Sequence, residues 1–179
     1  MDHAPSPSLA PSAADATAPA ASALQRLARL AAAAFSVPFT AVVPFGGGDG
    51  VAVAPAQAGH LGAATPDPRL ACASLPGDAA LVVVEDAAKD ARFLLPPEAR
   101  FFACARAETA DARVLGAVCL FDEHPRALST AETEQLLDLA ALAALALDSA
   151  ALAGACAQAE ARFQALSEAT FDALLILED

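Results

Sequence analysis

The sequence predicts an α+β domain whose central antiparallel sheet is covered on both sides and is followed by a long helix. Three apolar runs rich in β-branched and aromatic residues indicate strands, namely LVVV (81–84), FFACARA (101–107) and RVLGAVCLF (113–121). Only residues 108–112, which include the polar stretch ETAD, separate the second run from the third, which predicts a hairpin. From Ser129 onward the apolar spacing becomes that of a helix.

The run from Arg113 to Phe121 predicts the centre of this sheet. Successive side chains of a strand point to opposite faces. Both faces are apolar here, one with Val114, Gly116, Val118 and Leu120, and the other with Leu115, Ala117, Cys119 and Phe121. A strand that is apolar on both faces is expected to be buried on both sides.

The N-terminal segment, residues 1–21, is expected to be a disordered tail. It consists mainly of Pro, Ala and Ser, so it cannot bury enough apolar surface to offset the entropy cost of ordering. Ser22 is a suitable N-cap for a first helix. Pro38 disfavours helical geometry in the residue before it, so this helix should end by Ser36 or Val37. One face of the predicted helix is apolar and consists of Leu24, Leu27, Leu30, Ala31 and Ala34.

The segment after this helix predicts two short strands and a helical turn. Residues 39–45 (FTAVVPF) are the first predicted strand, and Pro44 confines it to a sheet edge or a strand end. Residues 51–55 (VAVAP) are the second, after the flexible turn GGGDG. Residues 57–77 are rich in Gly and Pro, and only RLACAS (69–74) predicts one or two helical turns.

A long C-terminal helix is predicted from Thr130 to about Ala169. Ser129 and Glu132 have the S-x-x-E spacing of a capping box. Such a helix is longer than one domain core needs, so we predict a parallel homodimer through it; the alternative is that its second half frays. The predicted dimer seam follows spacings of four and three residues through Leu136, Ala140, Ala143, Leu147, Ala150, Gly154, Ala157 and Ala161.

Composition and charge argue against several classes of function. The net charge is −12 and no cluster of Lys and Arg occurs, which argues against a nucleic-acid surface. The longest apolar stretch, residues 136–147, is too short to span a bilayer, and no secretory signal is recognisable, so we expect a cytoplasmic protein with no membrane partner. The cysteines at 72, 104, 119 and 156 lack metal-ligand spacing, so small buried hydrophobes and no metal are expected.

Motifs between residues 80 and 129 resemble the second half of a bacterial GAF domain. The resemblance extends over residues 22–148, although the first half matches mainly through LQRLARLAAAAFSVPFTAVV. It implies a GAF-like α+β fold, with a central antiparallel sheet, helices on both faces and a long C-terminal helix. The matching motifs are D-x-x-x-D-x-R-F (Asp86, Asp90, Arg92, Phe93), R-F-F-A (Arg100, Phe101, Phe102, Ala103), L-G-x-x-C ending in Asp (Leu115, Gly116, Cys119, Asp122) and P-R-x-L-S (Pro125, Arg126, Leu128, Ser129).

Residues 160–179 resemble the opening of a PAS domain. The predicted organisation is therefore a tail (1–21), a GAF-like sensory domain (22–148), a connecting helix (149–169) and the start of a truncated PAS-like domain (170–179). This order resembles the sensory half of bacterial histidine kinases and cyclic-di-GMP enzymes, and implies signal relay to PAS and output domains. The matches are a helix with Phe163, Leu166, Glu168 and Ala169, then a strand with Asp172, Ala173, Leu175, Leu177 and Asp179.

The GAF resemblance implies a pocket between one face of the sheet and its covering loops. Two interpretations stay open: the pocket binds a small, mostly apolar molecule, or its own side chains fill it and the domain is a structural dimerisation module. The candidate lining is Phe39, Ala41 or Val43, Cys72, Phe93, Phe102, Cys104 and Cys119, with Arg69 and Arg100 at the rim.

No catalytic residue and no cofactor are predicted, because no nucleophile with a matching base and no motif of a catalytic centre is present. A cysteine-based redox enzyme or sensor is a third alternative, since one GAF branch reduces methionine sulfoxide with cysteines. The Gly-Val-Cys-Gly and Ala-Cys-Asp motifs of that branch are absent. The Cys-His pair of bilin-binding relatives is absent, and the lack of any Asn excludes the Asn-Lys-Phe-Asp-Glu signature of cyclic-nucleotide-binding GAF domains.

Overall fold

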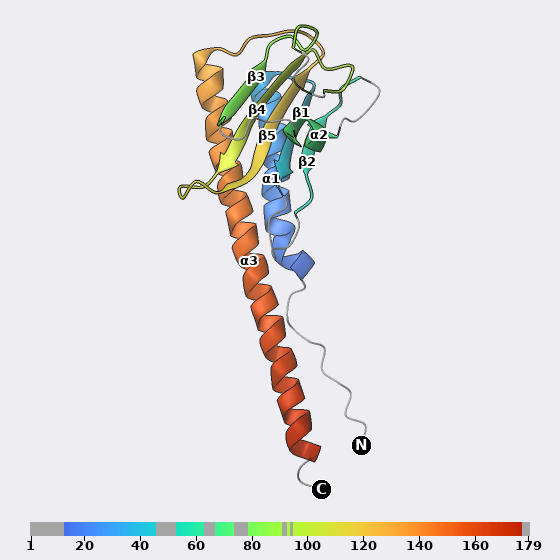
Figure 1. Ribbon diagram of the computed structural model, residues 1–179, viewed down its shortest axis with the longest axis vertical. Helices are drawn as coiled ribbons and strands as arrows, with labels where there is room; N and C mark the ends of the chain where they lie inside the picture. The colour runs from blue at the N-terminus through green and yellow to red at the C-terminus, as the bar shows by residue number, and fades with distance from the viewer. Residues whose placement is uncertain are drawn as a thin grey trace.

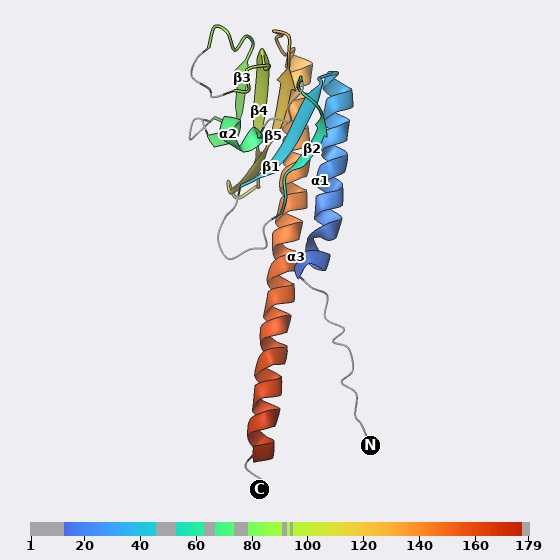
Figure 2. The ribbon, with the colours of Figure 1, turned by 90° about the vertical axis from the view of Figure 1, so that its right-hand side faces the viewer.

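The computed structural model describes residues 13–45, 53–62, 67–73, 79–90, 93 and 95–176, with side chains omitted at 13–17, 70, 73 and 168–176. A five-stranded antiparallel sheet has the order β2-β1-β5-β4-β3. Helices α1 and α3 cover one face, and the short helix α2 lies on the other (Figure 2). The α+β prediction, with a central antiparallel sheet, helices on both faces and a long C-terminal helix, is confirmed.

Helix α1 spans Ala13–Phe35 and begins nine residues before Ser22, so the predicted N-cap at Ser22 is wrong. The preceding residues are rich in alanine, the strongest helix former, and they continue the helix outward. Residues 13–21, expected in the tail, are therefore helical, while 1–12 lie outside the described residues. Pro19 lies inside α1, and the N-terminal part of this helix is bent (Figure 1), as expected near an internal proline.

The buried face of α1 differs in part from the predicted one. Leu24, Ala28, Ala31 and Phe35 are buried, whereas Leu30 is 58% exposed. The two small alanines allow α3 to approach closely, so the face that packs is set by size as well as by apolar character. The helix ends at Phe35, as predicted, and Ser36 turns the chain with a φ of 50°.

Strands β1 (Phe39–Pro44) and β2 (Ala56–Gly59) form one side of the sheet. Pro44 is the last residue of β1, as predicted. The second strand is not at 51–55: residues 53–55 are not in a strand, and 51 and 52 lie outside the described residues. Gly59 accounts for the shift. Its φ of 82° and its close approach to the Pro38 carbonyl oxygen leave no room for a Cβ where β2 pairs with β1.

The other side of the sheet follows the sequence pattern closely. Strands β3 (Leu81–Val84), β4 (Phe101–Glu108) and β5 (Val114–Asp122) are all antiparallel to their neighbours. The β4–β5 hairpin and the central position of β5 are confirmed. Helix α2 (Pro68–Ala73) confirms the helical turns predicted at 69–74, except that residue 74 is outside the described residues.

Helix α3 spans Thr130–Ile176 and runs antiparallel to α1, then projects well beyond the sheet (Figure 1). The predicted capping box is present: the Ser129 amide donates to Glu132 Oε2 at 2.8 Å, and the Glu132 amide donates to Ser129 Oγ at 3.2 Å. Arg126 anchors this end, because it donates to the Phe35 carbonyl oxygen at 2.8 Å and to Glu132 Oε1 at 3.0 Å. Its guanidinium also lies 5.6 Å from the centre of the Phe101 ring.

The strand expected within residues 172–179 is not formed in its described part, because α3 stays helical to Ile176. Leu177 and Asp179 lie outside the described residues. No proline or glycine interrupts residues 155–176, and a single strand without a partner strand would have no ladder hydrogen bonds. The helix is therefore the local preference of this segment.

The predicted dimer seam is wrong for its first six residues, because these are buried inside the protomer. The first part of α3 packs on α1 and on β4 and β5, so this stripe is already covered. Alternating spacings of four and three residues fit any partner helix, and here that partner is the chain's own α1. The buried seam residues are Leu136, Ala140, Ala143, Leu147, Ala150 and Gly154.

Among the residues that the structure describes, one helix is long and apolar enough to cross a membrane by length and composition alone, namely the Thr130–Ser167 part of α3. The core helix of a domain passes the same test. One apolar face of the first half of α3, with Leu136, Ala140 and Leu147, packs in the core under α1 and α3, which accounts for part of its apolar character.

Candidate functional site

The sheet face opposite α1 and α3 contains all of the predicted pocket residues. This face, which we call the α2 face, forms a second core separate from the one under α1 and α3. The structure brings together the whole candidate lining, consisting of Phe39, Ala41, Val43, Cys72, Phe93, Phe102, Cys104 and Cys119.

Among the described residues, the α2 face is packed with its own side chains. The ring centroids of Phe39 and Phe121 are 5.5 Å apart, those of Phe102 and Phe121 are 5.0 Å apart, and those of Phe93 and Phe102 are 6.1 Å apart. These are the tilted contacts that aromatic rings prefer. Phe121, which links two of the pairs, was not in the predicted lining, although its place on the Cys119 face of β5 could have identified it.

The two predicted rim arginines differ in what they contact. Arg100 donates from Nε and Nη2 to Asp86 Oδ1, at 3.1 and 2.9 Å. The Arg100 hydrogen bonds, together with one from the Ala88 amide, lower the pKa of Asp86 despite the opposing effect of desolvation. Arg100 therefore fixes the Asp86 turn, while Arg69 is exposed and its amide donates to Asp67 Oδ1 at 3.0 Å.

Three cysteines form a cluster at the centre of the α2 face. Cys119 Sγ lies 3.3 Å from Cys72 Sγ and 3.3 Å from Cys104 Sγ, and all three sulfur atoms lie within 4.8 Å of one another. The residues come from α2, β4 and β5, and Cys104 and Cys119 are direct cross-strand partners. Cys72 is 8%, Cys104 1% and Cys119 0% exposed.

The thiols of this cluster hydrogen bond to one another, and this shifts their acidity. Hydrogen bonds from Cys104 and then Cys119 lower the pKa of Cys72 to about 4, against desolvation and the charge of Asp67. The pKa of Cys119 is raised well above its usual value by its hydrogen bonds with Cys104 and Cys72 and by burial. The thiol of Cys72 is therefore the most acidic of the three.

The GAF resemblance placed the three cysteines in one candidate lining, but it did not predict that their sulfur atoms would converge. Linear spacing argued against metal ligands, but sheet register, rather than sequence distance, brings Cys104 and Cys119 together. The expectation of small buried residues holds for Cys72, Cys104 and Cys119 and is wrong for Cys156, which is exposed on α3.

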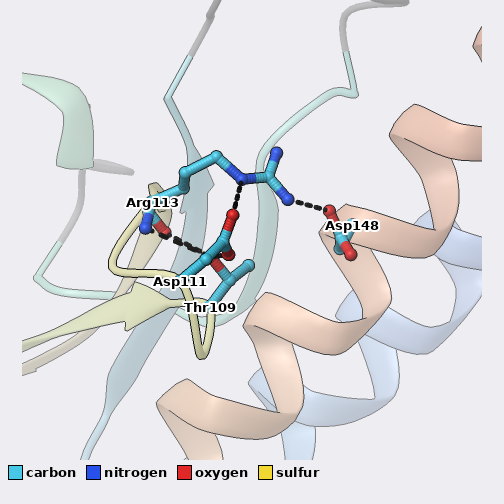
Figure 3. Close-up of polar contacts among 4 residues, drawn as sticks. All are labelled: Thr109, Asp111, Arg113 and Asp148. Atoms are coloured by element: carbon cyan, nitrogen blue, oxygen red, sulfur yellow. Dashed lines mark hydrogen bonds and ion pairs between the residues drawn. The ribbon is translucent and has the colours of Figure 1, made fainter.

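A polar network joins the β4–β5 hairpin to α3 (Figure 3). Arg113 Nε donates to Asp111 Oδ2 at 2.8 Å, and Arg113 Nη2 donates to Asp148 Oδ1 at 3.0 Å. Thr109 closes the turn, because its hydroxyl donates to Asp111 Oδ1 at 2.6 Å and accepts the Arg113 amide at 3.1 Å. Arg113 thus bridges the sheet to the midpoint region of the long helix.

A second apolar stripe on α3 faces solvent. Leu142, Leu145, Leu152, Phe163 and Leu166 are 51–74% exposed. Between them, Ser149, Cys156 and Ala159 are also exposed. These eight residues recur at spacings of three and four, which is the heptad pattern of a coiled coil. We call them the outer stripe.

The comparisons with known proteins establish the fold. Neither a family model nor a curated protein matches the chain. The structure is similar to the GAF domain/HD domain protein from Geobacter sulfurreducens, with 21% identity, 79% of this chain and 99% of that chain covered, and a TM-score of 0.57. It is also similar to the blue-light absorbing form of the Thermosynechococcus elongatus PixJ GAF domain, with 13% identity, coverage of 91% and 96%, and a TM-score of 0.55.

An enzyme shares the same fold. Free methionine-R-sulfoxide reductase from Neisseria meningitidis matches with 16% identity, coverage of 83% of this chain and 95% of that chain, and a TM-score of 0.51. At these identities the similarity is one of architecture. The chain therefore has the GAF domain fold, as the motifs between residues 80 and 129 indicated.

Proposed function

We propose that this chain is a sensory or regulatory GAF domain of a bacterial signal-transduction protein. It acts as a cytoplasmic parallel homodimer whose long helix α3 relays signals to downstream PAS-like and output domains of the histidine kinase or cyclic-di-GMP enzyme type. The observation that carries the proposal is the outer stripe, an exposed heptad pattern on a helix that projects beyond its own domain. The PAS-like motif at 160–179 supports a domain farther along the chain.

The outer stripe is suited to pairing with a second copy of α3. From Leu142 to Leu166 it follows the helix for about 36 Å, at about 1.5 Å per residue. The stripe combines leucines and Phe163 with three small residues, and the opposite stripe is already used for packing inside the protomer. A second copy supplies an identical stripe, so a symmetric pair buries both at once.

The Arg113 network supports a relay between the sheet and this helix. Arg113 contacts Asp148, which directly precedes Ser149 of the outer stripe. A movement of the β4–β5 hairpin would therefore displace Asp148 and the neighbouring part of the dimer interface. Rotations and register shifts of paired helices are common switching movements.

We also propose that these residues have no catalytic activity and bind neither nucleic acid nor membrane. The net charge of −12 disfavours binding to phosphates or anionic lipids. The three clustered thiols are at most 8% exposed, which disfavours a redox reaction on an external substrate. The packed rings of the α2 face favour a relay module over a preformed pocket for an organic molecule.

Cysteine crosslinking tests the dimer, because Cys156 lies in the outer stripe and is exposed. In a parallel pair, the two Cys156 side chains face each other. A short bifunctional maleimide should therefore link two chains of the unaltered protein, while Cys156→Ser should stay uncrosslinked. In the Cys156→Ser background, Ser149→Cys should restore the dimer band, because a parallel pair also places the two side chains at position 149 side by side. An antiparallel pair that met at residue 156 would hold the two residues at position 149 far apart.

The matched control is Ala161→Cys in the Cys156→Ser background. Ala161 belongs to the seam that the sequence predicted and lies outside the outer stripe, yet it is exposed. Crosslinking at Ala161→Cys with none at Cys156 or Ser149→Cys would disprove the outer stripe as the interface. Failure at all three positions, with a monomer mass by sedimentation, would disprove the dimer itself.

A further inference from the structure

The cysteine cluster has the composition of a metal site that the proposed function does not use. Its donors are three sulfur atoms from three different elements, and they converge within 4.8 Å of one another. Neighbouring buried side chains on the α2 face are apolar, including Phe39, Phe102 and Phe121. Thiolate sulfur is a soft ligand that selects Cu(I), Zn(II) or iron–sulfur centres over hard cations.

The spacing of the sulfur atoms is close to what one ion requires. With metal–sulfur bonds of about 2.3 Å, the sulfur atoms around a tetrahedral or trigonal ion lie about 3.8–4.0 Å apart. Two of the separations here are 3.3 Å, and none exceeds 4.8 Å. Side-chain movements of less than about 1 Å would therefore open the cluster around one ion, whereas an organic ligand would have to displace the packed rings.

We propose that Cys72, Cys104 and Cys119 form a binding site for one soft metal ion, Cu(I), held by three sulfur atoms. Zn(II) almost always takes four ligands at closed protein sites. Among the described residues, no further cysteine and no histidine lies at the cluster to supply a fourth donor. The fourth cysteine, Cys156, is exposed on α3. A closed site with three sulfur ligands therefore suits Cu(I) better than Zn(II).

A bound cation also offsets the negative charge of thiolate ligands. Each thiol that coordinates the ion as a thiolate releases one proton. Arg106 lies two residues from Cys104 on the same face of β4, so its positive charge offsets part of any excess negative charge. A divalent or trivalent hard cation would find no oxygen ligand in this cluster.

Binding would have a mechanical consequence for the fold. Cys72 belongs to the short helix α2, while Cys104 and Cys119 belong to the central strands. An ion held by all three would tie α2 to the sheet. The cluster lies on the sheet face away from α3 (Figure 2), so the ion would contact no residue of the outer stripe directly.

The test is a titration with Cu(I) under anaerobic, reducing conditions, in competition with a chromophoric Cu(I) chelator. The unaltered protein and the control Cys156→Ser should each bind one Cu(I) per chain. Cys72→Ala and Cys104→Ala should each weaken Cu(I) binding by at least about 100-fold. Removing a residue that only hydrogen bonds to a metal ligand costs at most about this much, so the loss of a ligand itself should cost more. Circular dichroism of each variant checks its fold, and Cys72→Ala leaves the strands of the sheet unaltered.

Two further measurements on the unaltered protein make the assignment specific. X-ray absorption at the copper edge should show a shell of sulfur atoms only, and Zn(II) in excess should not displace Cu(I). Unchanged binding by folded Cys72→Ala, or loss of binding in Cys156→Ser, would overturn the site. Nitrogen or oxygen ligands in the shell, or displacement by Zn(II), would overturn the three-sulfur Cu(I) assignment.

Discussion

Two leucines on opposite sides of α3 distinguish the protomer core from the dimer interface. Leu136 is 0% exposed and packs in the core under α1 and α3, whereas Leu152 is 63% exposed on the outer stripe. Leu136→Ala removes a fully buried side chain, so it should lower the free energy of unfolding by about 3 kcal/mol, within a usual range of about 2–5 kcal/mol. Leu152→Ala should change the stability of the isolated protomer by no more than about 0.5 kcal/mol.

The effect of Leu152→Ala should appear in dimerisation instead. Fully burying a leucine contributes about 1.5–3 kcal/mol, and roughly two thirds of this side chain is still exposed in the protomer, which leaves about 1–2 kcal/mol for the interface. Two copies per dimer give about 2–4 kcal/mol, or roughly a 30- to 900-fold increase in Kd. Leu136→Ala should leave Kd nearly unchanged while the fold persists.

Sedimentation equilibrium measures Kd, and urea unfolding at several protein concentrations measures stability. The unfolding midpoint of the unaltered dimer should rise with protein concentration, because association stabilises the folded state. If Leu136→Ala weakened dimerisation while Leu152→Ala did not, the two faces of α3 would have been assigned the wrong way round. If Leu136→Ala cost less than about 1 kcal/mol, the described core packing would be wrong.

Three further predictions concern the local structures that hold the domain together. Gly59→Ala should destabilise the fold by more than about 1 kcal/mol in urea unfolding, since its left-handed backbone and its contact with the Pro38 carbonyl oxygen exclude a Cβ; unchanged stability would contradict that geometry. Arg113→Ala should cost less than about 1 kcal/mol, because both it and Asp148 are partly exposed, and a larger loss would give the bridge a structural role beyond a surface ion pair. Hydrogen bonds from the Ser129 amide and then the Ser129 hydroxyl lower the pKa of Glu132. The stability that these bonds contribute is therefore present above the unfolded pKa of about 4.5. It is lost as the pH falls through the lower pKa of the folded state. Glu132→Gln should therefore lose stability at neutral pH and show a flatter acid dependence below about 4.5, and an identical acid profile would contradict the capping box.

The sheet was predictable where the signal was local. Both faces of residues 113–121 are apolar, which indicates a central strand without knowledge of any partner, and Ser129 with Glu132 marks a helix start within four residues. Strand β2 was misplaced because its short edge segment contains Gln57 and depends on Gly59, whose role is visible only beside Pro38. Local pattern is therefore strongest for central strands and helix caps.

The dimer seam and the thiol cluster required long-range information. Heptad spacing shows that a helix face is apolar, but α3 has two such faces, and only the position of α1 reveals that the stripe with Leu136 and Leu147 is already covered. The cluster depends on the register of β4 on β5 and on the position of α2. Neither fact follows from the distance between residues along the chain.

Strand β5 connects the two proposed functions physically. Cys119 faces the thiol cluster, while the neighbouring Val118 and Leu120 face the core under α1 and α3. At Gly116 a hypothetical Cβ would lie 2.9 Å from Leu147 Cδ1, so β5 and α3 are in close contact. An ion could bias α3 only if it bound more tightly to one helix arrangement than to another.

This coupling predicts that Cu(I) changes the separation of the two Cys156 residues in the dimer. Spin labels at Cys156 report that distance, and Cu(I) is diamagnetic, so the ion itself does not disturb the signal. The distance distribution should shift when Cu(I) binds the labelled protein and should stay constant in Cys72→Ala, which retains the outer stripe. An equal shift in both would mean that the ion acts elsewhere, whereas no shift in a protein that binds Cu(I) would separate the metal site from the relay.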